Sequence, residues 1–498
     1  MHETIKVISP VNEELIKELR VHTSEDVRKA VKKARDVFSD WSNLSFEDRA
    51  NYFKRATNIF LEEKEVIIDT LQKETGKART DALMAELFLG LGIMKFYEKN
   101  AEGYLKEKKI SGGGMSVMKD SFVRHFPYGL IGVITPWNYP LASIFSDAFP
   151  ALMAGNCVLV KPSSSTPLTS LLLDDIFKKA GIFEGVYQTI VCRGSSDATE
   201  VFIKEVDMVA FTGSTDVGIK IARMCAEELK PCTLELGGKD PMIVLEDANL
   251  ERASNAAVFG SLINTGQTCI SIERIYVVEG IYDEFVSKVV EKTESLRVGE
   301  DKDFNVDIGS MTTLDQLNAV LKQIKDAADK GAKILYGGKR IGEKGFFIEP
   351  TVIVDVDGSM EVMTEETFGP VIAIRKVKDA EEAIKLANST IYGLNGCIFT
   401  EDKENGKDLA MNIESGSICI NDCLVNYGIA ELPFGGVKKS GLGGRHSEIG
   451  ITRFCRTQSV VVDRFGSKKE MYWYPYSKKS ANTMLKVMDQ LYKGDEVL

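Results

Sequence analysis

Hydrophobic positions in the first hundred residues repeat with the spacing of an α-helix. Residues 1–107 are therefore predicted to be mainly helical. Ser24 is the expected cap of one amphipathic helix, whose apolar stripe consists of Val27, Val31, Ala34 and Val37. A second helical run begins at Ser45 and ends near Gly76, because serine favours a helix start and glycine a helix end.

From residue 128 onward, short β-rich runs alternate with helical segments. The first series of runs is 128–135, 157–161, 186–192 and 207–211. The second series is 243–245, 275–278, 333–336, 372–377, 398–400 and 417–421. Helices such as 168–180 and 314–330 lie between them. Repeated strand and helix units build parallel sheets that are covered on both faces, so the pattern predicts an α/β fold with two parallel-sheet domains.

The glycine pair 237–238 marks the expected domain boundary. The first domain comprises 1–107 and 125–237, and the second comprises 238–440. This boundary separates Glu235 from Cys269, so a site built from both would lie in the cleft between the domains, a common place for a small-molecule site.

Three segments fit neither sheet. The segment 108–124 contains the turn Ser111–Gly114 between polar extended runs, and 456–466 contains a late strand, 458–463. The tail 467–498 is rich in aromatic residues and is expected to form a helix with Met484, Met488, Leu491 and Tyr492 on one face. We expect this face to dock on the body of the protein; the alternatives are a lid over an apolar tunnel and a weak membrane-surface contact.

Composition narrows the class of protein. A length of 498 residues exceeds what one core accommodates, which agrees with two domains. The net charge of -11 argues against a nucleic-acid partner. Nine cysteines without a C-x-x-C pair, and only four histidines, predict neither a metal site nor a disulfide framework. No apolar stretch is long enough for an integral membrane segment and no leader is evident, so a soluble, cytoplasmic protein is expected.

Three short strings carry candidate chemistry. Asn138 lies between two prolines in 135–140 (TPWNYP), where a rigid loop can aim its amide at an oxyanion. Glu235 lies in an apolar run, where partial burial would raise its pKa and suit it to take a proton from water. Cys269 follows a small, polar loop and is a candidate nucleophile. Taken singly, each has an ordinary structural explanation: a turn, a strand residue and a buried thiol.

These strings, in this order, resemble the aldehyde dehydrogenase superfamily. Further matching strings are 345–352 (GFFIEPTV), 392–396 (YGLNG) and 433–441 (PFGGVKKSG), and the resemblance runs from about Ile8 to Val462. It implies two Rossmann-like domains, one for the cofactor and one for catalysis, with 108–124 and 456–466 as an oligomerisation flap in a homodimer or homotetramer. The alternative for 108–124 is a hairpin tucked against its own subunit.

The resemblance also implies catalytic roles. Cys269 would be the nucleophile, Asn138 and the Cys269 N–H the oxyanion donors, and Glu235 the base that activates water. Relatives that transfer the acyl group to coenzyme A lack a carboxylate at this place, so Glu235 favours hydrolysis of the thioester to a free acid. Two alternatives stay open, a thiol-type esterase and a catalytically silent relative.

A nicotinamide cofactor is the second implication. From the residues alone, 211–218 (FTGSTDVG) joins a strand to a helix whose first N–H groups can receive a pyrophosphate, although a simply capped helix has the same pattern. The resemblance assigns cofactor contacts to Pro136, Trp137, Lys161, Ser164, Gly213, Ser214, Gly218, Leu236, Glu366 and Phe368. NAD-preferring relatives commonly carry a glutamate where this chain has Ser164, so NADP should be tolerated beside NAD.

The substrate is left open between an apolar or aromatic aldehyde and one like succinate semialdehyde. A semialdehyde acid needs a cation in the cleft, and the linear sequence does not indicate which of the 62 basic residues faces it. The aromatic tail favours the apolar class.

Overall fold

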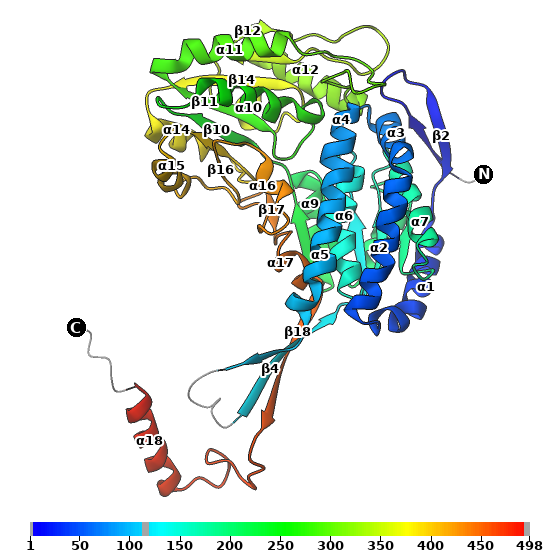
Figure 1. Ribbon diagram of the computed structural model, residues 1–498, viewed down its shortest axis with the longest axis vertical. Coiled ribbons are helices and arrows are strands. Elements are labelled where there is room, and N and C mark those ends of the chain that lie inside the picture. Colours follow the sequence, from blue (N-terminus) through cyan, green and yellow to red (C-terminus); the bar gives the residue numbers. More distant parts are fainter. Residues whose placement is uncertain (1–2, 112–118, 493–498) are drawn as a thin grey trace. The chain divides into compact units, whose positions relative to one another are not determined.

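The computed structural model describes residues 3–111 and 119–492 (Figure 1). The chain separates into two compact units, Met1–Tyr104 with Pro127–Phe454, and Leu105–Phe126 with Cys455–Leu498. The predicted α/β class with two Rossmann-like sheets is confirmed, and both sheets lie in the first unit. None of the helices in the described ranges combines the length and the hydrophobicity that crossing a bilayer requires.

The first sheet has six strands in the order β17-β9-β8-β5-β6-β7. Its strands are β5 (Leu130–Ile134), β6 (Cys157–Lys161), β7 (Tyr187–Thr189), β8 (Met208–Thr212), β9 (Cys232–Glu235) and the antiparallel β17 (Gly441–Leu442). Strand β5 pairs in parallel with β6 and β8, and all five of its side chains are buried, as expected for a strand covered on both faces. The helices that follow its strands are α6 (Pro140–Met153), α7 (Leu168–Lys179), α8 (Asp197–Glu205) and α9 (Thr215–Glu227).

Helices dominate the N-terminal region, as predicted. They are α1 (Ser24–Ser42), α2 (Phe46–Glu62), α3 (Lys64–Thr75), α4 (Arg79–Asp81), the π-helical η1 (Ala82–Phe88) and α5 (Leu89–Leu105). The expected cap Ser24 is wrong by one residue, because Thr23 accepts from the N–H of Asp26 and Asp26 reaches back in a capping box. Ser45 does cap α2. The hairpin of β1 (Thr4–Ile8) and β2 (Leu15–Arg20) was not predicted.

The second sheet has seven strands in the order β12-β13-β14-β11-β10-β15-β16. Its strands are β10 (Asp240–Val244), β11 (Ile272–Val278), β12 (Lys333–Tyr336), β13 (Thr351–Val354), β14 (Val371–Val377), β15 (Cys397–Phe399) and β16 (Cys419–Ile420). The larger helices beside it are α10 (Leu250–Leu262), α11 (Tyr282–Glu294), α12 (Leu314–Asp329), α14 (Ala380–Ala387) and α15 (Lys403–Ala410). The short ones are η3 (Ile263–Gly266), η4 (Glu279–Ile281), α13 (Glu361–Thr364) and α16 (Val425–Gly428). A further short helix, α17 (Ile449–Thr452), packs against α6. Central strands β10 and β11 are wholly buried.

The second unit holds a three-stranded antiparallel sheet and a helix. Its elements are β3 (Lys108–Ile110), β4 (Lys119–Pro127), β18 (Cys455–Asp463) and α18 (Lys478–Tyr492), and the strand order is β18-β4-β3. Most of the predicted glycine turn in 108–124 lies outside the described residues. On α18, Met484 is 39% and Met488 is 51% exposed, so no described residue of this unit covers the apolar face. That the face docks on the body of the protein stays a prediction.

Candidate functional site

A cavity of about 550 Å³ is lined by residues that directly follow β5, β8 and β9 of the first sheet and by residues that directly precede β11 and β14 of the second. Nine of the predicted site residues line it: Pro136, Trp137, Asn138, Gly213, Ser214, Leu236, Cys269, Glu366 and Phe368. Four do not line it: Lys161, Ser164, Gly218 and Glu235. The cavity therefore brings together segments that are more than two hundred residues apart in the sequence, and only the first sheet contributes the carboxyl ends of its strands, where α/β proteins commonly bind ligands.

Cys269 lies on a tightly bent loop between η3 and β11. Asn264 and Thr265 have φ angles of 54° and 59°, in the left-handed region that a β-branched threonine rarely adopts. Gly266 follows at 71°, and a Cβ atom there would lie 2.1 Å from the carbonyl oxygen of Gly369. The loop thus depends on glycine at position 266, and it presents a half-buried thiol to the cavity.

The surroundings of the thiol oppose its ionisation. Burial raises the pKa of Cys269 above its ordinary value, and the negative charges of Glu235, Asp240 and Glu366 raise it further, while Arg445 acts in the opposite direction. A reactive thiolate at this position needs a base or a cation to offset these effects.

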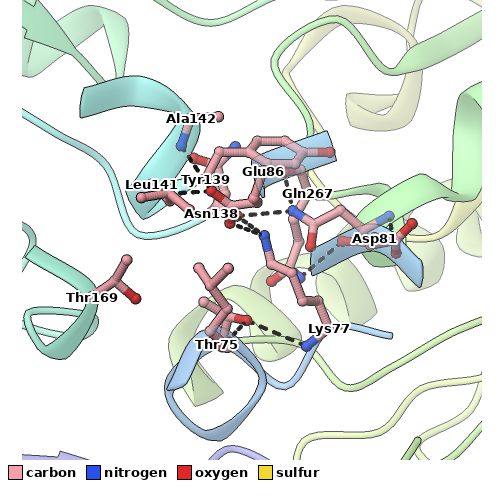
Figure 2. A network of polar contacts seen from close by, with 12 residues as sticks. Thr75, Lys77, Asp81, Glu86, Asn138, Tyr139, Leu141, Ala142, Thr169 and Gln267 are labelled. Atoms are coloured by element: carbon pink, nitrogen blue, oxygen red, sulfur yellow. Dashed lines mark hydrogen bonds and ion pairs between the residues drawn. The ribbon is translucent and has the colours of Figure 1, made fainter. Parts of the chain in front are cut away.

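Asn138 is fixed at both its side chain and its backbone (Figure 2). Its Nδ2 donates to the carbonyl oxygen of Gln267 at 2.8 Å. Its own carbonyl oxygen accepts from Lys77 Nζ at 2.7 Å and from Asn264 Nδ2 at 3.1 Å. Because a carboxamide has two N–H donors, one hydrogen remains for a ligand in the cavity.

Glu235 lies beside the cavity, not in its wall. It is the last residue of β9, is 2% exposed, and its Oε1 has no hydrogen-bond partner among the described residues. Burial raises the pKa of Glu235 to about 7, and Arg445 opposes this shift. A carboxyl group with this pKa can accept a proton from water near neutral pH.

Arg445 lines the cavity and belongs to a buried charge cluster whose other members, Asp147 and Arg453, do not line it. Its guanidinium binds Asp147 through two hydrogen bonds, Nε to Oδ1 at 3.0 Å and Nη2 to Oδ2 at 2.6 Å, and Arg453 Nη2 binds the same carboxylate at 2.5 Å. Burial alone would raise the pKa of Asp147, but the two arginines hold it below its ordinary value. The cation that lines the cavity is therefore already paired.

The turn between β8 and α9 has the form of an anion site. Ser214 occupies the N-cap position of α9 in an extended conformation and makes no side-chain capping hydrogen bond, so the helix N-terminus and the hydroxyl are both free to receive an anion. Gly218 has a packing reason of its own, since a Cβ atom there would lie 2.4 Å from the Leu236 side chain.

Two further predicted residues, Glu366 and Phe368, also line the cavity. Glu366 Oε1 accepts from the N–H of Gly238 at 3.1 Å, and burial raises its pKa to about 8. The ring of Phe368 meets Trp137 edge-on with centroids 5.3 Å apart. Together they form a polar and an aromatic surface that a heterocycle with an attached sugar could occupy.

Lys161 and Ser164 lie away from this cavity, at the end of β6 and in the loop after it. Lys161 is buried, and burial lowers its pKa. Ser164 is partly exposed. Neither residue has a contact that tests its expected role.

Comparison with known proteins decides the family. The model of the aldehyde dehydrogenase family matches residues 1–460. The chain belongs to this family. Succinate-semialdehyde dehydrogenase [NADP(+)] 1 of Mycobacterium tuberculosis is 36% identical over 460 residues, which cover 92% of this chain and 99% of that protein. The 4,4'-diapolycopene aldehyde oxidase of a Methylomonas species is 34% identical over 496 residues, which cover 99% of this chain and 92% of that protein.

Solved structures agree with the family. The NAD-dependent aldehyde dehydrogenase of Sinorhizobium meliloti superposes with a TM-score of 0.90 at 32% identity, covering 95% of this chain and 93% of that structure. This aldehyde dehydrogenase therefore oxidises aldehydes with a nicotinamide cofactor, and the free N-terminus of α9 fits the cofactor's diphosphate.

No motif or periodicity in the sequence indicates the buried groups that support the site. Lys77 and Glu86 reach the Asn138 loop, and Asp147 pairs with Arg445. All lie on or next to helices, where charged side chains are usually exposed, so a pattern of charges alone predicts the opposite location. One signal could have identified Asp147 as buried. It lies among apolar residues in α6, and every residue of this helix is buried.

Proposed function

We propose that Cys269, Asn138 and Glu235 carry out a hydrolytic aldehyde oxidation. The Cys269 sulfur attacks the aldehyde carbon, and the resulting oxyanion is held by the free N–H of Asn138 and the backbone N–H of Cys269. A bound nicotinamide supplies the hydride acceptor, and loss of the hydride leaves a thioester on Cys269. Glu235 then takes a proton from water, the hydroxide displaces the sulfur, and the free acid leaves.

The observation that carries this proposal is that the thiol and the carboxamide line one cavity, with an unpaired, neutral-range carboxyl group directly behind its wall. The raised pKa of the Cys269 thiol is consistent with a nucleophile that loses its proton only as it reacts. A cationic nicotinamide ring would also favour the thiolate.

A single-turnover experiment tests the proposal. With enzyme in excess over aldehyde, wild type should release acid and reduced nicotinamide in equal amounts. Cys269→Ala should yield neither, whereas Glu235→Gln should yield the reduced cofactor and retain an acyl group that mass spectrometry finds on residue 269. Turnover by Cys269→Ala would refute the proposal.

The substrate class that the cavity fits is an apolar aldehyde without a carboxylate. The walls are mostly apolar and include Met84, Leu89, Trp137, Phe259, Ile263, Ile270, Leu424 and Val425. Arg445 is the one cation among the described residues that line the cavity, and Asp147 already neutralises it. Asp422, which also lines the cavity, would repel the carboxylate of a semialdehyde acid. The names of the relatives include both substrate classes and do not distinguish between them. The proposal of an apolar aldehyde therefore rests on the residues that line the cavity.

Substrate competition tests this assignment. We expect kcat/KM for a medium-chain or aromatic aldehyde to exceed that for succinate semialdehyde by at least about 100-fold, since an unpaired charge in an apolar site costs several kcal/mol. Val425 lines the cavity and is 50% exposed. Val425→Arg should reduce the ratio of kcat/KM for the apolar aldehyde to kcat/KM for succinate semialdehyde, whereas Val425→Met should leave this ratio unchanged. A wild-type preference for the semialdehyde would exclude the apolar class.

The cofactor preference follows from the neighbourhood of Lys161. Lys161 and Ser164 would hold the adenosine ribose, and a neutral hydroxyl at position 164 does not repel a 2′-phosphate, so both NADP and NAD should serve. We further propose that 1–107 with 125–237 bind the cofactor and that 238–440 carry the nucleophile.

The second unit is proposed to join subunits into a homodimer or homotetramer. Strands β18 and β3 are the two edges of its sheet, and edge strands offer unpaired backbone groups to another chain. Light scattering on the full chain, and on a variant with Val461→Lys on β18, tests this; a monomeric wild type would exclude it.

A further inference from the structure

An ion pair that is closed off from solvent lies beside the cavity but outside its wall. Lys77 and Glu86 both have side chains with 0% exposure, and Lys77 Nζ binds Glu86 Oε1. Neither residue is among those that line the cavity. Burying two charges costs solvation energy that their attraction barely recovers, and an apolar pair of similar volume is often as stable. Stability is therefore a poor explanation for the pair.

The pair holds both ends of the segment that carries Asn138 (Figure 2). Lys77 Nζ donates to the Asn138 carbonyl oxygen at 2.7 Å and lies 4.4 Å from the centre of the Tyr139 ring. Glu86 Oε2 accepts from the N–H groups of Leu141 and Ala142, both at 2.9 Å. The carboxylate thus binds the N-terminus of α6, where the helix dipole strengthens the contact.

The loop of the nucleophile completes the enclosure from the other side. Asn264 Nδ2 is the second donor to the Asn138 carbonyl oxygen, and the carboxamide of Asn138 is tied to Gln267. These contacts fix the backbone of Asn138 and one hydrogen of its side-chain amide. Because the amide is planar, they also fix the direction in which its second hydrogen points. Lys77 makes the one charge-assisted hydrogen bond in this set, which makes it the strongest of the constraints.

Glu86 is placed by the π-helical turn η1. This turn also supplies Met84 and Ala85 to the cavity wall, so consecutive residues face the cavity and the ion pair. π-Helical turns are uncommon and occur frequently at functional sites.

We propose that Lys77 and Glu86 are positioning residues, which hold the free N–H of Asn138 where the oxyanion forms. The inference rests on the proposed role of Asn138. Neither residue touches the substrate; they act through the 138–142 segment. An oxyanion donor that is displaced by about 1 Å loses much of its effect, with rate losses on the order of 10²-fold.

A double-mutant cycle tests the inference. Lys77→Met removes the charge and with it the contacts to Glu86, the Asn138 carbonyl oxygen and the Tyr139 ring, but keeps a similar volume. In wild type it should lower kcat by about 10- to 100-fold, with the KM for aldehyde and the Kd for the cofactor changed less than about 3-fold. In Asn138→Ala the same substitution should cost less than about 3-fold, because the group that it positions is gone.

Glu86→Gln is the second variant, in case Lys77→Met does not fold. It keeps an acceptor for the Leu141 and Ala142 N–H groups, so its loss of kcat should be smaller than that of Lys77→Met. This loss should again be much smaller when Asn138 is already alanine. Lys32→Met, which breaks the exposed pair with Asp36 on α1, is the matched control and should leave kcat unchanged. Thermal melting reports the folding of every variant.

The outcomes separate the two levels of the proposal. If Lys77→Met or Glu86→Gln lowers kcat by the same factor with and without the Asn138 side chain, the ion pair has a general structural role and the inference is overturned. Wild-type kcat in both variants would overturn it as well. Full activity of Asn138→Ala would instead overturn the proposed function of Asn138 itself.

Discussion

The carboxamide of Asn138 donates to the carbonyl oxygen of Gln267 at 2.8 Å, two residues before Cys269. This bond joins the loop after β5 in the first sheet to the loop before β11 in the second. A parallel contact links the neighbouring residues, Tyr139 Oη with Thr268 Oγ1 at 2.8 Å. The relative position of donor and nucleophile is thus set locally, by two hydrogen bonds, and not only by the packing of the sheets.

Replacing Asn138 by alanine should lower kcat on the order of 10²-fold, since it removes a preorganised oxyanion donor. Cofactor affinity should hardly change, because the bond to Gln267 supports the nucleophile loop and not the α9 turn. Steady-state kinetics and fluorescence titration measure the two quantities. Asn58→Ala, on an exposed position of α2, is the control. A variant that keeps more than half of the wild-type kcat would remove Asn138 from the mechanism.

Turnover should rise with pH through about 7. Glu235 acts in its deprotonated form and its pKa is raised to about 7 by burial, so the active fraction grows roughly tenfold per pH unit below that value and levels off above it. Glu235→Gln should be slow at every pH and lose this rise. A kcat profile between pH 5.5 and 8.5 measures it, and an unchanged profile in the variant would assign the titration to another group.

A glutamate at position 164 should discriminate against NADP. The new carboxylate would repel the 2′-phosphate, lowering kcat/KM with NADP by at least about 10-fold while NAD use is retained or improved. Ser164→Gln matches the size without the charge and should leave the ratio of the two cofactors near that of wild type. If Glu and Gln shift the ratio equally, side-chain volume and not charge governs the choice.

Strands buried on both faces were the best predicted elements, because their apolar runs are continuous. The run 157–161 coincides with the wholly buried β6, and 372–377 differs from the largely buried β14 by one residue. The prediction lacks β9 and β13, which are four residues long and lie next to or within the Glu235 and 345–352 motifs. Thr23 and Ser24 are both capping residues, and the choice between them depends on the capping box with Asp26.

The catalytic strings were identified because each stands in a long motif. The buried charged residues that hold them in place were not identified, because their partners lie far away in the sequence. Lys77 acts on Asn138, 61 residues away, and Asp147 on Arg445, 298 residues away. A charge on a helix becomes a buried partner only through such long-range contacts, which leave no periodic trace near the residue itself.

The last prediction concerns the buried cluster behind Glu235. Asp147→Asn leaves Arg445 and Arg453 side by side without their shared anion, and an uncompensated buried charge costs on the order of 3 kcal/mol. The melting temperature of Asp147→Asn should therefore fall by several degrees. Asp36→Asn, which breaks an exposed ion pair, should change the melting temperature little. The folded variant should also have its kcat profile displaced to lower pH. Asp147 raises the pKa of Glu235 and the two arginines lower it, so removing the anion leaves the arginines unopposed. A melting temperature equal to that of the control, or a displacement to higher pH, would contradict this account of the cluster.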